Sequence, residues 1–87
     1  MTQDEQMAGL RARFLERLEE DRARLEAAIA AGDEAVIRAL VHRISGAAGM
    51  FGYAALSDRA AEVEEALDEG ADVEALVDRL LAEIRAA

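Results

Sequence analysis

The sequence predicts an all-α domain that folds as an antiparallel, up-down-up-down four-helix bundle. The chain has no proline, only two phenylalanines and one tyrosine as aromatic residues, and abundant alanine, leucine, glutamate and arginine, a composition that favours helices. Its 87 residues suffice for one small core, so we expect a single domain over residues 1–87. The breaks between the predicted helices are short, and short loops force successive helices to lie antiparallel.

The first helix is predicted over residues 3–31. A straight helix of this length spans about 42 Å, much more than the helices that follow it. It therefore either overhangs the bundle or bends near the charged run 19–22, and of these we expect a kink or a loosely attached N-terminal turn. Its apolar positions repeat at helical spacing and comprise Met7, Leu10, Phe14, Leu18, Leu25 and Ile29.

Three shorter helices are predicted over residues 33–51, 53–69 and 72–86. Gly32 suits a left-handed helix end, and Asp33 suits the N-cap that follows it. Likewise, Gly70 marks the end of the third helix and Asp72 can cap the fourth. The third and fourth helices have apolar positions at Leu56, Ala60, Val63, Leu67, Val73, Leu76, Val77, Leu80, Leu81 and Ile84.

Composition and charge exclude several classes of function. The net charge of −9 argues against nucleic acid and against anionic membrane surfaces as partners. Without cysteine the chain has no disulfide framework and no thiolate nucleophile or metal ligand. No long uncharged apolar run is present, and the polar start MTQDEQM does not read as a secretory signal. We therefore expect a cytoplasmic protein that binds neither nucleic acid nor membrane.

His42 is the only histidine, and helical phase places it away from the core. At about 100° per residue, it lies about 160° from the centre of the apolar stripe of its helix, so it should face water. Gly46 and Gly49 lie on the same outward side, with Ser45 beside them. The stripe itself comprises Val36, Ile37, Leu40, Val41, Ile44, Ala47, Ala48 and Phe51.

The two outward glycines are costly, which makes them informative. Each is roughly 1 kcal/mol less favourable than alanine inside a helix, so the pair costs on the order of 2 kcal/mol. One interpretation is that they let another helix pack closely and that His42 is an ordinary solvated residue. Close packing, however, needs small residues on the core face, where Ala47 and Ala48 already lie.

Other chemistries fit the residues around His42 poorly. A Ser-His-Asp hydrolase would use Ser45 or Ser57, but no oxyanion hole or enclosed pocket is indicated. One histidine with scattered carboxylates makes a weak metal site. A glycine-rich phosphate-binding loop is also not indicated, because the Ser-Gly-Ala-Ala-Gly run lies within a helix whose backbone N–H groups are already hydrogen-bonded. An exposed neutral imidazole can instead accept a phosphoryl group, provided that a partner protein brings its phosphorylated side chain within in-line reach.

The segment HRISGAAGMFGY from His42 to Tyr53, followed by Ala55-Leu56-Ser57, resembles the signature of histidine-containing phosphotransfer (HPt) domains. The resemblance implies that His42 carries a phosphoryl group on Nε2. It implies as partners a response-regulator receiver domain, whose aspartate gives or takes the phosphoryl group, a histidine kinase, or both. It further implies no ATP binding and no autonomous kinase activity, and no cofactor in this chain, because the receiver supplies Mg²⁺.

The sequence departs from the family pattern at one position. Ser45 stands where the family usually has lysine, so the cation beside the phosphoryl group is missing. A hydroxyl still donates a hydrogen bond, but one roughly half as strong. Arg38, one turn before His42, or the adjacent Arg43 could supply a guanidinium; the alternative, which we favour for each of them, is an ordinary solvated arginine.

The second ring nitrogen of His42 needs a partner that selects the tautomer. In family members of the chemotaxis kinase type, a glutamate on the next helix accepts that hydrogen bond, and the resemblance places Glu64 there. The alternative is that Glu64 is a surface carboxylate with no role in the site.

Gly46 and Gly49 are expected to leave the surface around His42 free of bulky side chains, so that a receiver can dock there.

Three functions remain open at this point. The first is a phosphorelay intermediate that uses His42 and acts as a monomer. The second is a degenerate, HPt-like module that docks to a receiver or kinase without being phosphorylated, as the missing lysine suggests. The third is a bundle that merely self-associates.

Overall fold

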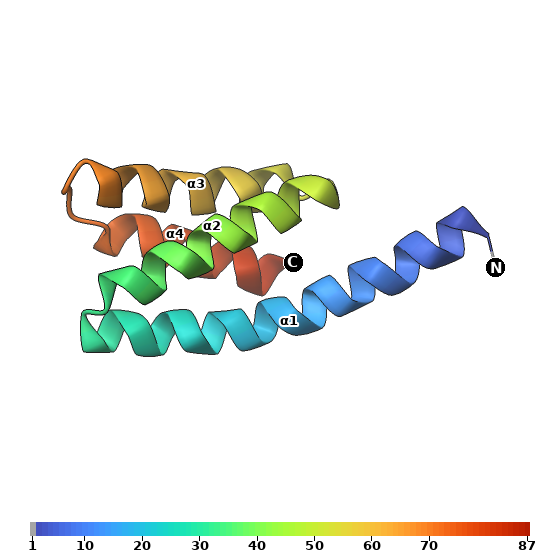
Figure 1. Ribbon diagram of the computed structural model, residues 1–87, viewed down its shortest axis with the longest axis horizontal. Helices are drawn as coiled ribbons and strands as arrows, with labels where there is room; N and C mark the ends of the chain where they lie inside the picture. The colour runs from blue at the N-terminus through green and yellow to red at the C-terminus, as the bar shows by residue number, and fades with distance from the viewer. Residues whose placement is uncertain (1) are drawn as a thin grey trace.

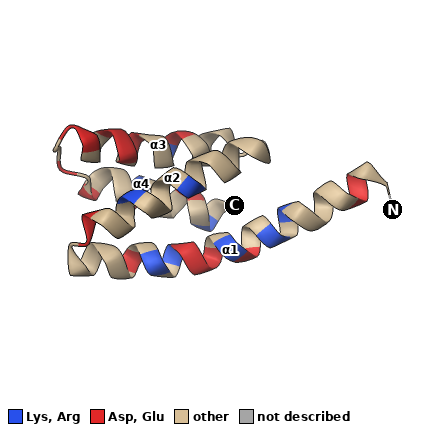
Figure 2. Cartoon of the chain, in the orientation of Figure 1, with Lys and Arg blue, Asp and Glu red and all other residues tan. Residues whose placement is uncertain are grey.

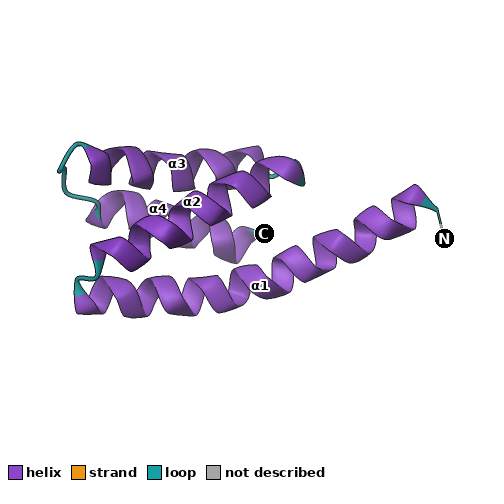
Figure 3. Ribbon diagram, in the orientation of Figure 1, coloured by secondary structure: helices purple, strands orange, loops and turns teal. Residues whose placement is uncertain are grey.

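The computed structural model describes residues 2–87 and consists of four α-helices joined by short loops (Figure 3). The helices are α1 (Gln3–Ala31), α2 (Glu34–Met50), α3 (Ala54–Asp68) and α4 (Glu74–Ala86). Each runs opposite to the one before it, as the colours of Figure 1 show. Helices α1 and α3 both pack against α2 and α4, so the four surround one core. The predicted all-α four-helix bundle is confirmed.

The core consists of the inward faces of the four helices. Leu25, Val41, Val63 and Leu80, one from each helix, have no exposed surface at all. The other buried apolar residues are Leu18, Ala28, Ile37, Leu40, Ile44, Ala48, Leu56, Ala60, Ala66, Leu67, Val77, Leu81 and Ile84. No helix within the described residues is long and apolar enough to cross a membrane.

Helix α1 is continuous and extends well beyond its neighbours (Figure 1). Residues 19–22 are helical like the rest of α1, and the N-terminal part of the helix runs at an angle to the part that packs on the bundle, so the first helix is both long and bent (Figure 1). The ring of Phe14 lies 5.3 Å from that of Phe51 and 5.6 Å from that of Tyr53, and N-terminal to this cluster α1 leaves the bundle. Leu10, a member of the predicted apolar stripe, is 47 % exposed on the part of α1 that extends beyond the bundle.

The helix ends follow local backbone chemistry. Gly32 adopts the left-handed conformation with φ of 66°, which reverses the chain after α1. Asp33 then accepts a hydrogen bond from the Val36 N–H at 3.3 Å and caps α2. Asp72 accepts from the Glu74 N–H at 3.1 Å, but α4 begins only at Glu74, two residues after the predicted start.

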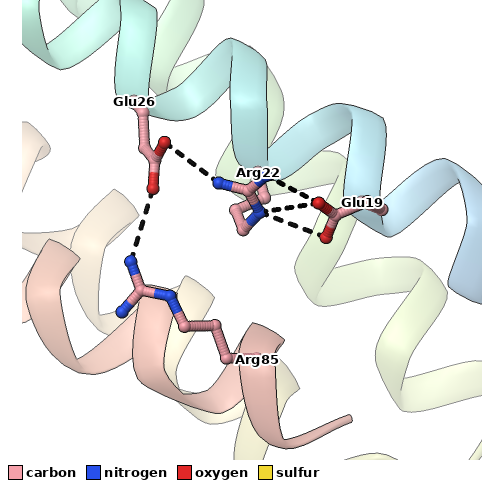
Figure 4. Close-up of polar contacts among 4 residues, drawn as sticks. All are labelled: Glu19, Arg22, Glu26 and Arg85. Carbon is pink, nitrogen blue, oxygen red and sulfur yellow. Dashed lines mark hydrogen bonds and ion pairs between the residues drawn. The ribbon is translucent and has the colours of Figure 1, made fainter.

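Polar contacts attach α1 to the last helix (Figure 4). Arg22 lies between Glu19 and Glu26 on the same helix, with N–O distances of 2.6 and 3.0 Å. Glu26 also reaches Arg85 of α4 at 3.4 Å. The two pairs that Arg22 makes join residues three and four positions apart within α1, and this spacing stabilises the helix through the charged run.

Candidate functional site

His42 lies on the outer surface of α2, next to the exposed Arg43. Val41 and Ile44, on either side of these two residues, are buried. Its side chain is 78 % exposed. The imidazole is therefore held on a helix whose opposite face is anchored in the core, while the ring itself faces water. This is the orientation that the helical phase predicts.

Glu64 of α3 reaches across to the imidazole. Its Oε2 lies 2.9 Å from His42 Nδ1, and its side chain is 29 % exposed. An ionised carboxylate only accepts hydrogen bonds, so this contact favours the tautomer of the neutral ring in which the Nδ1–H donates a hydrogen bond to Glu64 Oε2. The neutral ring then has its free lone pair on Nε2, the nitrogen that Glu64 does not contact. The neighbouring Val63 is fully buried, which fixes the part of α3 from which Glu64 projects.

The surface beside the imidazole is open. A Cβ atom placed on Gly46 would meet nothing within 4 Å, and one placed on Gly49 would meet only the Ser57 hydroxyl at 3.5 Å, an ordinary contact. Ala39 is exposed, and Met50 is 74 % exposed on the same helix. Packing inside the bundle therefore does not require glycine at position 46.

Ser45 is joined to Ser57 of α3 by a reciprocal pair of hydrogen bonds. The Ser45 hydroxyl donates to the Ser57 carbonyl at 3.1 Å, and the Ser57 hydroxyl donates to the Ser45 carbonyl at 2.8 Å. The only hydroxyl proton of Ser45 is thus directed at α3, where it connects the two helices. Sequence reasoning named both serines but gave no signal for this pairing, because they are separated by a turn and by twelve positions.

The two candidate arginines have carboxylate partners on other helices. Arg38 is paired with Asp68 of α3, and Arg43 is paired with Asp21 of α1. The carboxylates differ in environment: the Asp68 side chain is 60 % exposed and that of Asp21 only 5 %. Among the candidates, the structure thus brings together His42 and Glu64, and it connects Ser45, Arg38 and Arg43 to other residues.

Asp21 and Asp68 were missed by sequence reasoning. Asp21 had a recognisable signal, because it lies three residues after Leu18 and four before Leu25, on the buried stripe of α1. A carboxylate at such a position needs a cation from a neighbouring helix. Asp68 had no comparable signal, because it is one of several acidic residues at the exposed end of α3.

Charge is distributed unevenly over the fold. Acidic residues gather at the end of the bundle where α3 ends and where α2 and α4 begin (Figure 2). Arginines lie mainly along the middle of α1 and on α2. Within residues 2–87, no cluster of three or more histidine and carboxylate side chains is suited to hold a metal ion.

The comparisons with known proteins agree with this geometry at the level of the family. A family model described as the Hpt domain matches residues 9–87, which is nearly the whole chain and includes every candidate residue of the site. No curated protein and no solved structure shows a significant match to the sequence.

Proposed function

Because the chain belongs to the Hpt domain family, we propose that it is a histidine phosphotransfer protein of a two-component phosphorelay and that His42 is its phosphoryl acceptor. The observation that carries the proposal is the hydrogen bond from His42 Nδ1 to Glu64, 2.9 Å long. It leaves Nε2 unprotonated on an exposed imidazole. A nucleophile of this kind suits a group that must reach the active site of another protein.

The proposed transfer step needs no proton movement. The Nε2 lone pair of His42 attacks the phosphorus of a receiver's aspartyl phosphate, and the bond from phosphorus to the aspartate oxygen breaks. The electron pair leaves with the aspartate, which departs as a carboxylate. The phosphorylated ring keeps its proton on Nδ1 and becomes cationic, so the Glu64 carboxylate stabilises the product as well as the reactive tautomer.

The surface around His42 supports a receiver domain as the partner. In-line transfer requires the phosphorylated aspartate to come within bonding reach of Nε2. Gly46 and Gly49 allow that approach, while Ala39 and Met50 offer exposed apolar atoms for contact. We propose that the receiver supplies the Mg²⁺ for the reaction and that this chain contributes no cofactor. A histidine kinase is a second proposed partner.

The proposal includes a monomeric protein acting in the cytoplasm. The four helices bury their apolar faces on one another within one chain, so the fold needs no second copy. The cytoplasm is the proposed location because this chain would encounter receiver domains and the catalytic parts of histidine kinases there.

One observation favours a second candidate, a docking module that is not phosphorylated. Ser45 has no charge, and its hydroxyl proton is directed to the Ser57 carbonyl at 3.1 Å. In this function the open surface of α2 would bind a receiver or kinase without accepting its phosphoryl group.

Incubation with phosphorylated receivers tests the two candidates. We expect radiolabel to move from the receiver to the wild-type protein and not to His42→Ala, while His42→Ala still binds the receiver. Receiver binding without label transfer would support the docking module instead. If the protein binds no receiver and its molecular mass in solution increases with its concentration, its function is self-association.

A further inference from the structure

We propose that Arg38 supplies the positive charge for the phosphoryl group on His42, and that it does so by exchanging Asp68 for that group. This inference rests on the proposed function, since it requires a phosphoryl group on Nε2. It assigns different roles to the two arginines that lie near His42 on α2. Arg38 is a phosphoryl-binding residue, whereas Arg43 holds the fold together.

The site needs a cation because it is already acidic. A phosphoryl group adds about 1.5 to 2 negative charges at neutral pH. The carboxylate of Glu64 lies at the ring, and Asp68 follows one turn later on the same face of α3. Glu64 offsets the positive charge of the phosphorylated ring, but Asp68 has no such counterpart and would repel the phosphoryl oxygens unless a neighbouring cation offsets their charge.

Ser45 contributes no charge, and its hydroxyl proton is directed at the Ser57 carbonyl. If that proton turned toward the phosphoryl group, Ser45 would lose its hydrogen bond to α3. A neutral donor would also make a weaker bond to phosphate than a guanidinium does. Among the candidate residues of the site, only Arg38 and Arg43 carry a positive charge.

Arg43 is held by its partner. The Asp21 side chain is only 5 % exposed, so departure of Arg43 would leave a buried carboxylate without its closest counter-charge. The remaining arginine near Asp21 is Arg24, at 4.0 Å and 58 % exposed. Leaving a buried carboxylate without its ion-pair partner is strongly unfavourable, and this cost opposes any movement of Arg43 toward His42.

Arg38 is free to exchange partners. Its own side chain is 41 % exposed and that of Asp68 is 60 % exposed, so water can solvate the carboxylate once the guanidinium leaves. Arg38 lies four residues before His42, and residues at this spacing are neighbours on a helix surface. The pairs Arg38–Asp68 and His42–Glu64 cross from α2 to α3 at adjacent turns. A phosphoryl group, with more charge than a carboxylate, would draw the guanidinium from one pair to the other.

Phosphoramidate gives a test that needs no receiver. In this reaction Nε2 attacks phosphorus, the P–N bond of phosphoramidate breaks, and ammonia leaves with the electron pair. Phosphohistidine formation is followed by ³¹P NMR in the wild-type chain and in variants. We expect Arg38→Gln to slow formation about tenfold, as for loss of one charge-assisted hydrogen bond, and Arg38→Lys to recover part of the rate.

Two further variants separate this role from a structural one. Asp68→Asn frees Arg38, so phosphohistidine should form at least as fast as in the wild-type chain. Arg43→Gln, the matched control, should leave the rate unchanged while it lowers the stability of the fold. The inference is overturned if Arg38→Gln reacts like the wild-type chain, if Asp68→Asn slows the reaction as much as Arg38→Gln, or if Arg43→Gln has the larger effect.

The test also distinguishes this inference from the relay. If receivers fail to transfer to His42 but phosphoramidate labels it, the relay is wrong and the role of Arg38 is still measured. If neither donor labels the wild-type chain, both proposals are overturned.

Discussion

Arg43 of α2 is paired with Asp21 of α1 at the face where these two helices pack together. Asp21 is the buried charged residue of the described chain, with 4 % of its surface exposed. It occupies a stripe position between Leu18 and Leu25, where an apolar residue would be expected. Since a buried carboxylate needs a counter-charge, Arg43 supplies what Asp21 requires at this face of α1.

The first prediction concerns this pair. Arg43→Gln should lower the free energy of unfolding by about 2 kcal/mol, because Asp21 stays buried without its closest cation. Urea denaturation followed by circular dichroism measures the change. Replacing both partners by apolar residues, as in Asp21→Leu with Arg43→Met, should restore stability or exceed it. A single variant as stable as the wild-type chain would show that the ion pair contributes nothing.

The second prediction concerns Glu64. Glu64→Gln keeps an acceptor for His42 Nδ1 but removes the charge, so transfer from a phosphorylated receiver should slow about tenfold. Glu64→Ala removes the acceptor as well and should be slower still. Rapid-quench measurement of label on His42 gives these rates. The matched control is Glu65→Gln, since Glu65 is the exposed neighbour on α3, and its transfer rate should equal that of the wild-type chain.

The third prediction separates docking from folding at Gly46. A Cβ atom there meets nothing within 4 Å, so Gly46→Ala should raise the free energy of unfolding by about 0.5 to 1 kcal/mol through its better helix propensity. Gly46→Leu should fold as well but slow transfer from the receiver, because the larger side chain obstructs the approach to His42. Phosphoramidate labelling of Gly46→Leu should stay close to the wild-type rate. Unchanged receiver transfer by this variant would contradict the docking surface.

The fourth prediction concerns pH and the contacts of α1. The hydrogen bond from Arg22 holds the pKa of the Glu19 carboxyl below its usual value. Because this pKa is lowered in the folded state, the contact stabilises the fold above the ordinary glutamate pKa and is lost as the pH falls through the lowered value. Arg22→Gln should return Glu19 to an ordinary titration midpoint. NMR titration of the Glu19 side chain in the wild-type chain and in Arg22→Gln measures this shift.

The helical class and the outward position of His42 followed from local properties of the chain. Helix propensity, glycine at positions 32 and 70 and apolar spacing act within a few residues, so they are readable from sequence order alone. The same reasoning gave the bounds of α1 but not which of its stripe residues are buried. The exposure of Leu10 depends on how far the other helices extend, and that is decided by their packing.

The sequence by itself therefore determined the set of helices. It also determined the face of α2 on which His42, Gly46 and Gly49 lie. The resemblance to HPt domains added Glu64 as the partner of His42. Only the tertiary structure decided which carboxylate each arginine meets and that Ser45 bonds to Ser57. The physical reason is that such pairings join residues about twelve to thirty positions apart, and their strength depends on burial, which exists only once the helices have packed.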